Sequence, residues 1–197
     1  MPTATTPATK PPRVTKRRAE TRARLVEAAF RVFSGKGYGH VTIEDVCLAA
    51  GYTRGAFYSQ FENLEELFFL LYDQWAARTA EQVSTAMQHS TELRGVVERV
   101  VDTLFFERDW LLIKFDFLLH AARHPKVAHR WDAHRAQLRN VIEERLVAAG
   151  IASHESADTA RAVIVAYDGV SAQLLLDGDE ASARARLSQV LNAVLTQ

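Results

Sequence analysis

The 197-residue sequence has little cysteine and no long apolar run. A single cysteine, Cys47, excludes a disulfide within the chain and is typical of a reducing compartment. No apolar stretch is long enough to span a bilayer, and the N-terminus lacks the apolar segment of a secretory signal peptide. These absences predict a soluble, cytoplasmic protein that makes no contact with a membrane.

Net charge is also absent, because 24 Lys and Arg residues are balanced by 24 Asp and Glu residues. The overall charge therefore gives no sign of a nucleic-acid partner. The distribution of charge along the chain does indicate an anionic partner for the N-terminal segment. Residues 1–24 contain several cations and only one acid, Glu20, so the rest of the chain is net acidic. Residues 1–15, rich in Thr, Pro and Ala, are predicted to be a disordered basic arm, either on phosphates or simply solvated. The basic character of this arm continues into Lys16, Arg17 and Arg18.

Glycine and proline are scarce, at nine and five residues, and several of them separate segments in which apolar residues recur at helical spacing. This pattern predicts an all-α protein of about nine helices. We expect two short helices within 42–61 and longer helices at about 16–34, 64–88, 92–107, 110–123, 125–149, 156–176 and 181–195.

Residues 42–61 read as two short helices joined by a tight turn. Thr42 is a good N-cap, with Asp45 three residues on, and Gly51 can end the first helix in the left-handed conformation. Thr53 would cap the second helix. The spacing is that of a helix-turn-helix, whose second helix can enter a DNA major groove; the alternative is a hairpin in an ordinary helical bundle.

The stretch TRARLVEAAFRVFSGKGYGHVTIEDVCLAAGYTRGAFYSQFENLEELF resembles the N-terminal domain of TetR-type transcriptional repressors, over roughly residues 18–72. The resemblance implies a helix-turn-helix DNA-binding domain at 16–62 and a C-terminal helical effector-binding and dimerisation domain at 63–197. It also implies a bacterial homodimer, associated with the nucleoid when bound, that binds a palindromic double-stranded DNA operator and is released by a small apolar or amphipathic effector. Two residues depart from the family pattern: Gln60 stands where histidine is common, and Leu64 stands where a phosphate-binding lysine is usual.

By that resemblance, Arg54 is the best candidate to read a base, because its guanidinium can bond guanine N7 and O6 together, although a phosphate contact is the alternative. Gly55 would let the backbone approach the groove. The predicted interface is completed by hydroxyls and cations that could meet phosphates: Thr42, Tyr52, Thr53, Tyr58, Lys16, Arg17 and Arg18. The alternative for the tyrosines is a role as packing rings, and the alternative for Thr42 is a plain helix cap.

Large rings concentrate around residues 104–131, and an apolar cavity with a few polar groups is the usual form of a small-molecule site. Core packing is the alternative for each ring. The predicted effector-binding residues are Trp75, Phe105, Phe106, Trp110, Phe115, Asp116, His120, Trp131, Tyr167 and Gln173. Asp116, His120 and His124 share a helix face, but the ligand count is unsupported, so we predict no metal and no cofactor.

Residues 156–195 carry two broad apolar stripes that could pair with a second copy as a four-helix bundle, or pack within one chain. No phosphate loop, recognisable nucleophile or metal signature indicates an enzyme. We therefore predict a ligand-responsive dimeric transcriptional regulator, most simply a repressor. The alternative is a helical protein-interaction module that does not read DNA.

Overall fold

The structure is a computed structural model that describes residues 13–87, 93–104 and 106–195. Within these ranges all regular structure is helical, as nine α-helices and one 3₁₀ turn, which confirms the predicted all-α class. The helices are α1 (Arg13–Lys36), α2 (Ile43–Ala50), α3 (Arg54–Tyr58), α4 (Leu64–Met87), α5 (Leu93–Thr103), α6 (Arg108–Arg123), α7 (Pro125–Ala148), α8 (Ser153–Asp177) and α9 (Glu180–Leu195). The 3₁₀ turn η1 is Tyr38–His40.

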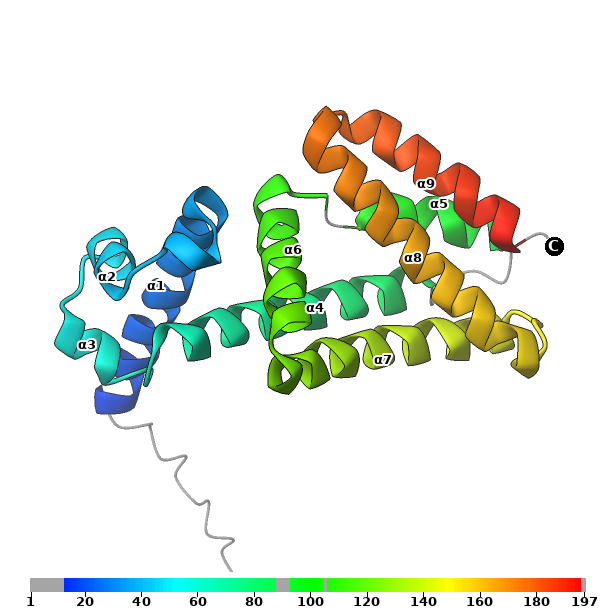
Figure 1. The fold of residues 1–197 in the computed structure, drawn as a ribbon. Coiled ribbons are helices and arrows are strands. Elements are labelled where there is room, and N and C mark those ends of the chain that lie inside the picture. The colour runs from blue at the N-terminus through cyan, green and yellow to red at the C-terminus, as the bar shows by residue number, and fades with distance from the viewer. Residues whose placement is uncertain (1–12, 88–92, 105, 196–197) are drawn as a thin grey trace, which may run out of the picture.

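Helices α1, α2 and α3 gather at one end of the molecule (Figure 1). They surround a small core because α1 places Leu25, Ala29 and Phe33 on one face, all fully buried. Phe57 of α3 is buried in the same cluster. Helix α1 begins at Arg13, so the last three residues of the expected disordered arm are helical, and residues 1–12 lie outside the described part of the chain.

The turn between α2 and α3 forms as its sequence predicts. Thr42 and Asp45 make a capping box, in which the Thr42 hydroxyl accepts from the Asp45 N–H and the Asp45 carboxylate accepts from the Thr42 N–H. Gly51 ends α2 with φ 70° and ψ 33°, a left-handed conformation that glycine adopts at least cost. Thr53 caps α3 by accepting from the N–H of Ala56.

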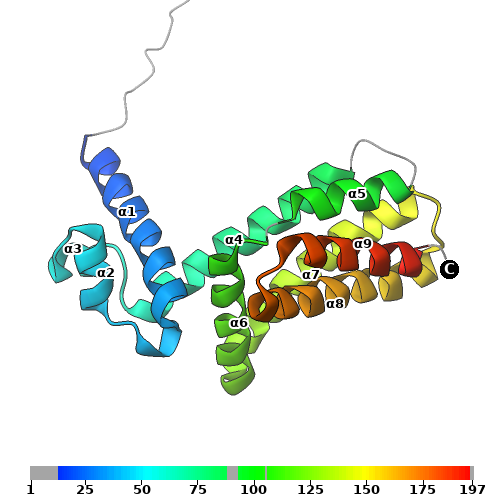
Figure 2. The ribbon, with the colours of Figure 1, turned by 90° about the horizontal axis from the view of Figure 1, so that it is seen from above.

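Helix α4 connects the two halves of the molecule. Asn63 caps its first turn by accepting from the Glu66 N–H at 2.8 Å, while the Glu66 carboxylate accepts from the Glu62 N–H at 2.7 Å. The helix runs from beside α3 to beneath α5 (Figures 1 and 2). One uninterrupted helix therefore belongs to both halves of the molecule.

Helices α5 and α7 pack against α4, and α8 and α9, which lie side by side, pack against α7 and α5 respectively (Figure 2). Helix α6 stands between this bundle and α1–α3, and it contacts α1 and η1 on one side and α7 and α8 on the other. In the described ranges no helix is both long and apolar enough to cross a membrane.

Candidate nucleic-acid interface and internal cavities

The first turn of α3 is exposed on the surface. Thr53, Arg54, Gly55 and Tyr58 all face solvent, whereas Phe57 on the opposite side of the helix is fully buried. This alternation follows from the helical period, because the side that holds Phe57 in the core leaves the other side free. The residues that sequence analysis assigns to DNA reading are therefore accessible together.

Arg54 is held by an acid in the free protein. Its guanidinium makes an ion pair with Glu44 of α2, donates to the Tyr58 hydroxyl at 3.3 Å, and lies 5.8 Å from the centre of the Tyr58 ring. The Tyr58 hydrogen bond and the Glu44 charge raise the pKa of Arg54 above its already high value, so the group is always charged. Sequence analysis missed Glu44, although its position at the start of α2, ten residues before Arg54, could have indicated the pair.

Gly55 has no structural reason to be glycine. A Cβ built there would meet only the Thr53 hydroxyl, at 3.8 Å, which is ordinary contact distance. Its φ is not positive, and glycine inside a helix costs about 1 kcal/mol relative to alanine. The cost without an internal benefit points to something outside the chain that must approach the backbone closely.

The remaining predicted contacts have other partners in the structure. The Thr42 hydroxyl donates to Asp45 Oδ2. The other carboxylate oxygen, Asp45 Oδ1, accepts from Lys36 Nζ at 2.6 Å. These contacts lower the pKa of the Asp45 carboxyl to about 2, with the Lys36 hydrogen bond as the largest cause. Tyr52 is half-buried and packs against the core, so its ring has a structural role.

Lys16, Arg17 and Arg18 are exposed in the first turns of α1. Arg18 donates to the carbonyl of Ser59 at 3.2 Å, just past the end of α3. One turn further, Arg22 donates to the carbonyl of Gln60 at 2.8 Å and covers the Phe61 ring. Cations of α1 thus fix the end of the recognition helix, and Gln60 meets α1 through its backbone.

Two small cavities lie inside the C-terminal bundle. The first has a volume of about 50 Å³ and is enclosed by α4, α5, α7, α8 and α9. Its walls are almost entirely aliphatic, including Val97, Val100, Ile142 and Leu187. We refer to it as the aliphatic cavity. Of the predicted effector-binding residues, it contains Tyr167 alone.

The second cavity, also of about 50 Å³, adjoins the first through the shared residues Thr79, Leu138 and Tyr167. Trp110 and Trp131 of the predicted set line it. We refer to it as the polar cavity, because charged side chains from three helices meet in its wall.

The charges in the polar cavity are unequal. Lys114 Nζ lies 2.7 Å from one oxygen of Asp168, and Arg135 makes an ion pair with the other oxygen. Lys114 is almost completely buried and also lies 4.1 Å from the centre of the Tyr167 ring. Burial is the largest cause and lowers the pKa of Lys114 overall, although the charge and hydrogen bond of Asp168 act to raise it. Two basic side chains thus share one carboxylate.

Other predicted effector-binding residues lie elsewhere. Asp116 and His120, on the far side of α6, both contact Tyr38 of the N-terminal domain: Asp116 Oδ2 accepts from the Tyr38 N–H at 2.9 Å, and the His120 ring lies edge-on to the Tyr38 ring with centres 4.8 Å apart. His120 Nε2 also lies 3.0 Å from Glu65 in the first turn of α4. Gln173 is exposed and donates to Asp177. Neither cavity brings these three residues together.

The remaining rings pack in the core or at the domain junction. Trp75 stacks between Phe30 of α1 and Trp110 of α6, with ring centres 4.8 and 5.6 Å away. Phe115 is half-buried beside Lys114, and Phe105 lies outside the described residues. Among the residues that the structure describes, no group of three His, Cys, Asp or Glu side chains is arranged to hold a metal ion.

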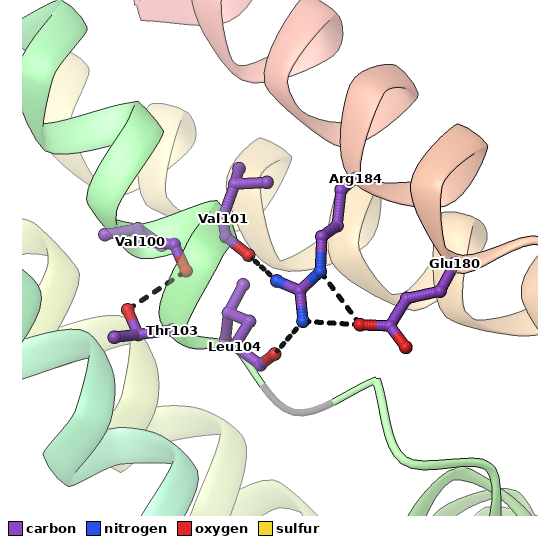
Figure 3. A network of polar contacts seen from close by, with 6 residues as sticks. All are labelled: Val100, Val101, Thr103, Leu104, Glu180 and Arg184. Carbon is purple, nitrogen blue, oxygen red and sulfur yellow. Dashed lines mark hydrogen bonds and ion pairs between the residues drawn. The ribbon is translucent and has the colours of Figure 1, made fainter.

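An arginine of α9 holds α5, the helix that forms one wall of the aliphatic cavity. Arg184 donates to the backbone carbonyls of Val101 and Leu104 at the C-terminal end of α5, and to Glu180 on its own helix (Figure 3). Its guanidinium lies 5.0 Å from the centre of the Phe106 ring. Cations near a helix C-terminus satisfy carbonyls that lack partners inside the helix.

An exposed helix-turn-helix joined by a continuous helix to a domain with internal cavities defines a DNA-binding regulator of the helix-turn-helix class. Residues 25–71 match the model of the bacterial regulatory proteins of the tetR family, and residues 84–197 match the tetracyclin repressor-like C-terminal domain. The second match covers more than half of the chain, and the chain belongs to the TetR family. The resemblance read from the sequence is therefore confirmed.

Curated relatives are regulators of transcription, not enzymes. The HTH-type transcriptional repressor AcnR of Corynebacterium diphtheriae is 31% identical over 127 residues, which are 64% of this chain and 63% of AcnR. The regulator TtgR of Pseudomonas putida is 36% identical over 108 residues, which are 55% of this chain and 47% of TtgR. The chain thus spans less than two-thirds of the length of these relatives.

Solved structures agree on the fold over nearly the whole chain. A TetR-family transcriptional regulator from Streptomyces coelicolor superposes with a TM-score of 0.74 at 25% identity, covering 90% of this chain and 95% of that one. A transcriptional regulator from Rhodococcus has a TM-score of 0.77 at 17% identity, covering 89% and 96%, and shows the fold alone.

Proposed function

We propose that this protein is a dimeric repressor of the bacterial cytoplasm that binds a palindromic operator at the nucleoid and leaves it when a small molecule enters the C-terminal domain. The observation that carries the proposal is the double role of α6. One side of this helix lines the polar cavity with Trp110 and Lys114, and the other side contacts the DNA-binding half through Asp116 and His120.

The DNA contacts that we propose begin with Arg54 as the base reader and Gly55 as the point of closest backbone approach. Thr53 and Tyr58 flank them on the same exposed surface, and Thr42, Tyr52, Lys16, Arg17 and Arg18 contribute on the phosphate side. A guanidinium bound to guanine N7 and O6 contributes about 1–3 kcal/mol of discrimination between bases.

The dimer that we propose is built on the outer face of α8, in the region 156–195. Val165, Gly169, Ala172 and Leu176 recur at helical spacing, and all four are exposed, Leu176 at 83%. Most of the broader apolar stripes that the sequence predicts on α8 and α9 are buried within the single chain. The buried residues are Ile164, Tyr167, Leu174, Leu187 and Leu191.

A close dimer contact would explain Gly169. A Cβ at this helical position would meet nothing within 4 Å, so the chain itself does not require glycine there. A partner helix that packs on Gly169 and Ala172 does benefit from small residues, because they let two helices approach closely.

The cavities support a switch because they are small. Ligand sites for drug-sized molecules commonly have volumes of about 300–1,000 Å³, well above the volume of either cavity here. An effector must therefore separate helices to enter, and it binds best to a conformation that differs from this one. Since α6 and α4 both line the polar cavity and both reach the DNA-binding half, the separation changes the spacing of the two recognition helices.

The test is a gel shift of the dimer on its own upstream intergenic DNA at several salt concentrations, with Arg54→Ala and the exposed Lys126→Ala as a matched control. If Arg54 reads a base, Arg54→Ala lowers affinity for the operator by about 1–3 kcal/mol and relaxes sequence preference, whereas a phosphate contact weakens all DNA equally and lowers the salt slope by about one. Operator affinity that is unchanged in Arg54→Ala would contradict the assignment of α3 as the reading helix.

A further inference from the structure

The polar cavity holds two basic side chains and only one acidic side chain. Lys114 and Arg135 both bind Asp168, so two basic groups share one carboxylate within the cavity wall. His134 also lines the cavity, and its Nε2 lies 2.6 Å from Asp73, a carboxylate that Arg130 contacts as well. Asp73 is therefore already paired with His134 and Arg130, and it does not balance Lys114 and Arg135.

The Trp110 indole N–H borders the same cavity. Trp110 is 2% exposed, and its indole N–H donates to the Tyr167 hydroxyl, although the geometry of this hydrogen bond is imperfect. A ligand oxygen in the polar cavity would offer this donor a better-aligned acceptor. Trp110 lines the polar cavity together with Lys114.

The adjoining space accepts an apolar body. The aliphatic cavity continues from the polar cavity past Thr79, Leu138 and Tyr167, and its other walls carry no charged group. A molecule that extends through both cavities thus meets two basic side chains and the Trp110 N–H at one end and valine, leucine and isoleucine at the other.

A surface depression borders the polar cavity. Arg135, Arg139 and Arg161 line it with one acid, Asp132, and Trp131 and Arg135 line both the depression and the polar cavity. The three arginines make ion pairs with Asp168, Glu143 and Asp158 respectively, so the depression has no clear surplus of positive charge. Its part in ligand binding is as a route of entry from solvent past Trp131 and Arg135.

The depression also touches the proposed dimer face. Val165, which is 63% exposed and belongs to the outer stripe of α8, lines it as well. A second copy seated on α8 would border the entrance, so binding must be measured on the dimer.

We propose that the effector is an amphipathic carboxylic acid whose carboxylate binds Lys114, Arg135 and the Trp110 N–H, and whose chiefly aliphatic body fills the cavity beneath α5. This assignment rests on the proposed ligand-responsive function, and it names the chemical class of the ligand for that site. A carboxylate supplies a second negative charge beside Lys114 and Arg135 and an acceptor for the Trp110 N–H. An alcohol lacks the negative charge, and an ammonium would add a further positive charge beside two basic side chains.

The test compares three amphiphiles of equal chain length by calorimetric titration of the intact dimer, below their micelle concentrations: decanoate, decanol and decyltrimethylammonium. Decanoate is expected to bind about tenfold or more tightly than decanol, because it adds a charged hydrogen-bonding group beside two basic side chains, and decyltrimethylammonium is expected to bind most weakly. Binding of none of the three, or preference for the alcohol or the ammonium, overturns the proposal.

Two variants and one control locate the charge. Lys114→Met leaves Arg135 and Asp168 as a balanced pair and should remove the preference for decanoate over decanol, while the exposed Lys126→Met should leave it unchanged. Asp168→Asn removes the internal carboxylate, so decanoate should raise the melting temperature of this variant more than that of the parent protein. A full preference in Lys114→Met, or a smaller rise in Asp168→Asn, overturns the assignment of the site.

Operator release is measured separately, so that the two proposals can fail independently. Binding of decanoate without release of operator DNA supports the anion site and contradicts the effector role. Release of the operator by decanol or decyltrimethylammonium, with no effect of decanoate, supports the switch and overturns the carboxylate proposal.

Discussion

The carboxylate of Asp116 accepts a hydrogen bond from the backbone N–H of Tyr38 at 2.9 Å, across a separation of 78 residues. Asp116 belongs to α6 and Tyr38 to the turn that follows α1, so the bond joins the C-terminal half of the molecule to the helix-turn-helix half. The ring of Tyr38 stacks on Phe68 of α4 and lies edge-on to His120 of α6. Three elements therefore meet at one residue.

Removing this contact should loosen the junction. Asp116→Ala leaves the Tyr38 N–H without its acceptor and is expected to lower the free energy of unfolding by about 1–3 kcal/mol. It should also accelerate hydrogen exchange at the Tyr38 amide. Urea unfolding and amide exchange measured by NMR check both effects. Asp116→Asn is the control because it keeps an acceptor oxygen; equal loss in both variants would assign the effect to charge.

The dimer face can be tested by filling it without harming the monomer. Gly169→Leu has open space around its new side chain and replaces a residue of low helix propensity, so the helix should gain up to about 1 kcal/mol. The bulk should nevertheless keep a partner helix away. Analytical ultracentrifugation should detect a shift from dimer to monomer with helical content unchanged. A stable dimer of this variant would place the interface elsewhere.

Arg184 should control the stability of α5. Arg184→Gln loses the charged hydrogen bonds to the carbonyls of Val101 and Leu104 and should lower the free energy of unfolding by about 1–3 kcal/mol. Amides of α5 should exchange faster than those of α7. Arg186→Gln, two residues away and exposed beside Asp177 at 3.5 Å, is the control and should change stability by less than about 0.5 kcal/mol. Equal effects at the two positions would exclude a specific role of Arg184 at α5.

The start of α2 should respond to acid at unusually low pH. The pKa of the Asp45 carboxyl is lowered from 3.8 to about 2, so its contribution to stability is complete above about pH 4 and is lost as the pH falls toward 2. Because the Lys36 hydrogen bond is the largest cause, Lys36→Met should raise this pKa more than Thr42→Val does. Carbon-detected NMR titration of the Asp45 carboxyl measures each value, and the reverse order would contradict the stated cause.

Sequence reasoning succeeded where the signal is local. The caps at Thr42 and Thr53 and the left-handed Gly51 depend on residues only three or four positions apart, and the structure confirms all three. The helix ends are reproduced to within a few residues for the same reason.

The interior was harder to predict because its contacts join distant residues. Lys114 and Asp168 are 54 positions apart, and the pattern that could have revealed Lys114 is its place as a lone cation inside the apolar run 110–115. The rings chosen as pocket walls mostly pack on one another, since large apolar side chains fill space more often than they border it. The aliphatic cavity lies under α5, whose valines give no sign in sequence that one side borders a void.

The ion pair between Arg54 and Glu44 has a consequence for how the operator is found. On DNA of random sequence the phosphates must compete with a carboxylate that already occupies the arginine, and that carboxylate repels them. On the proposed operator the Arg54 guanidinium can leave Glu44 and make two hydrogen bonds to guanine N7 and O6 instead. If Arg54 reads guanine as proposed, we expect the acid to shorten each stay at a wrong position more than the stay at the right one, and so to speed the search along the chromosome.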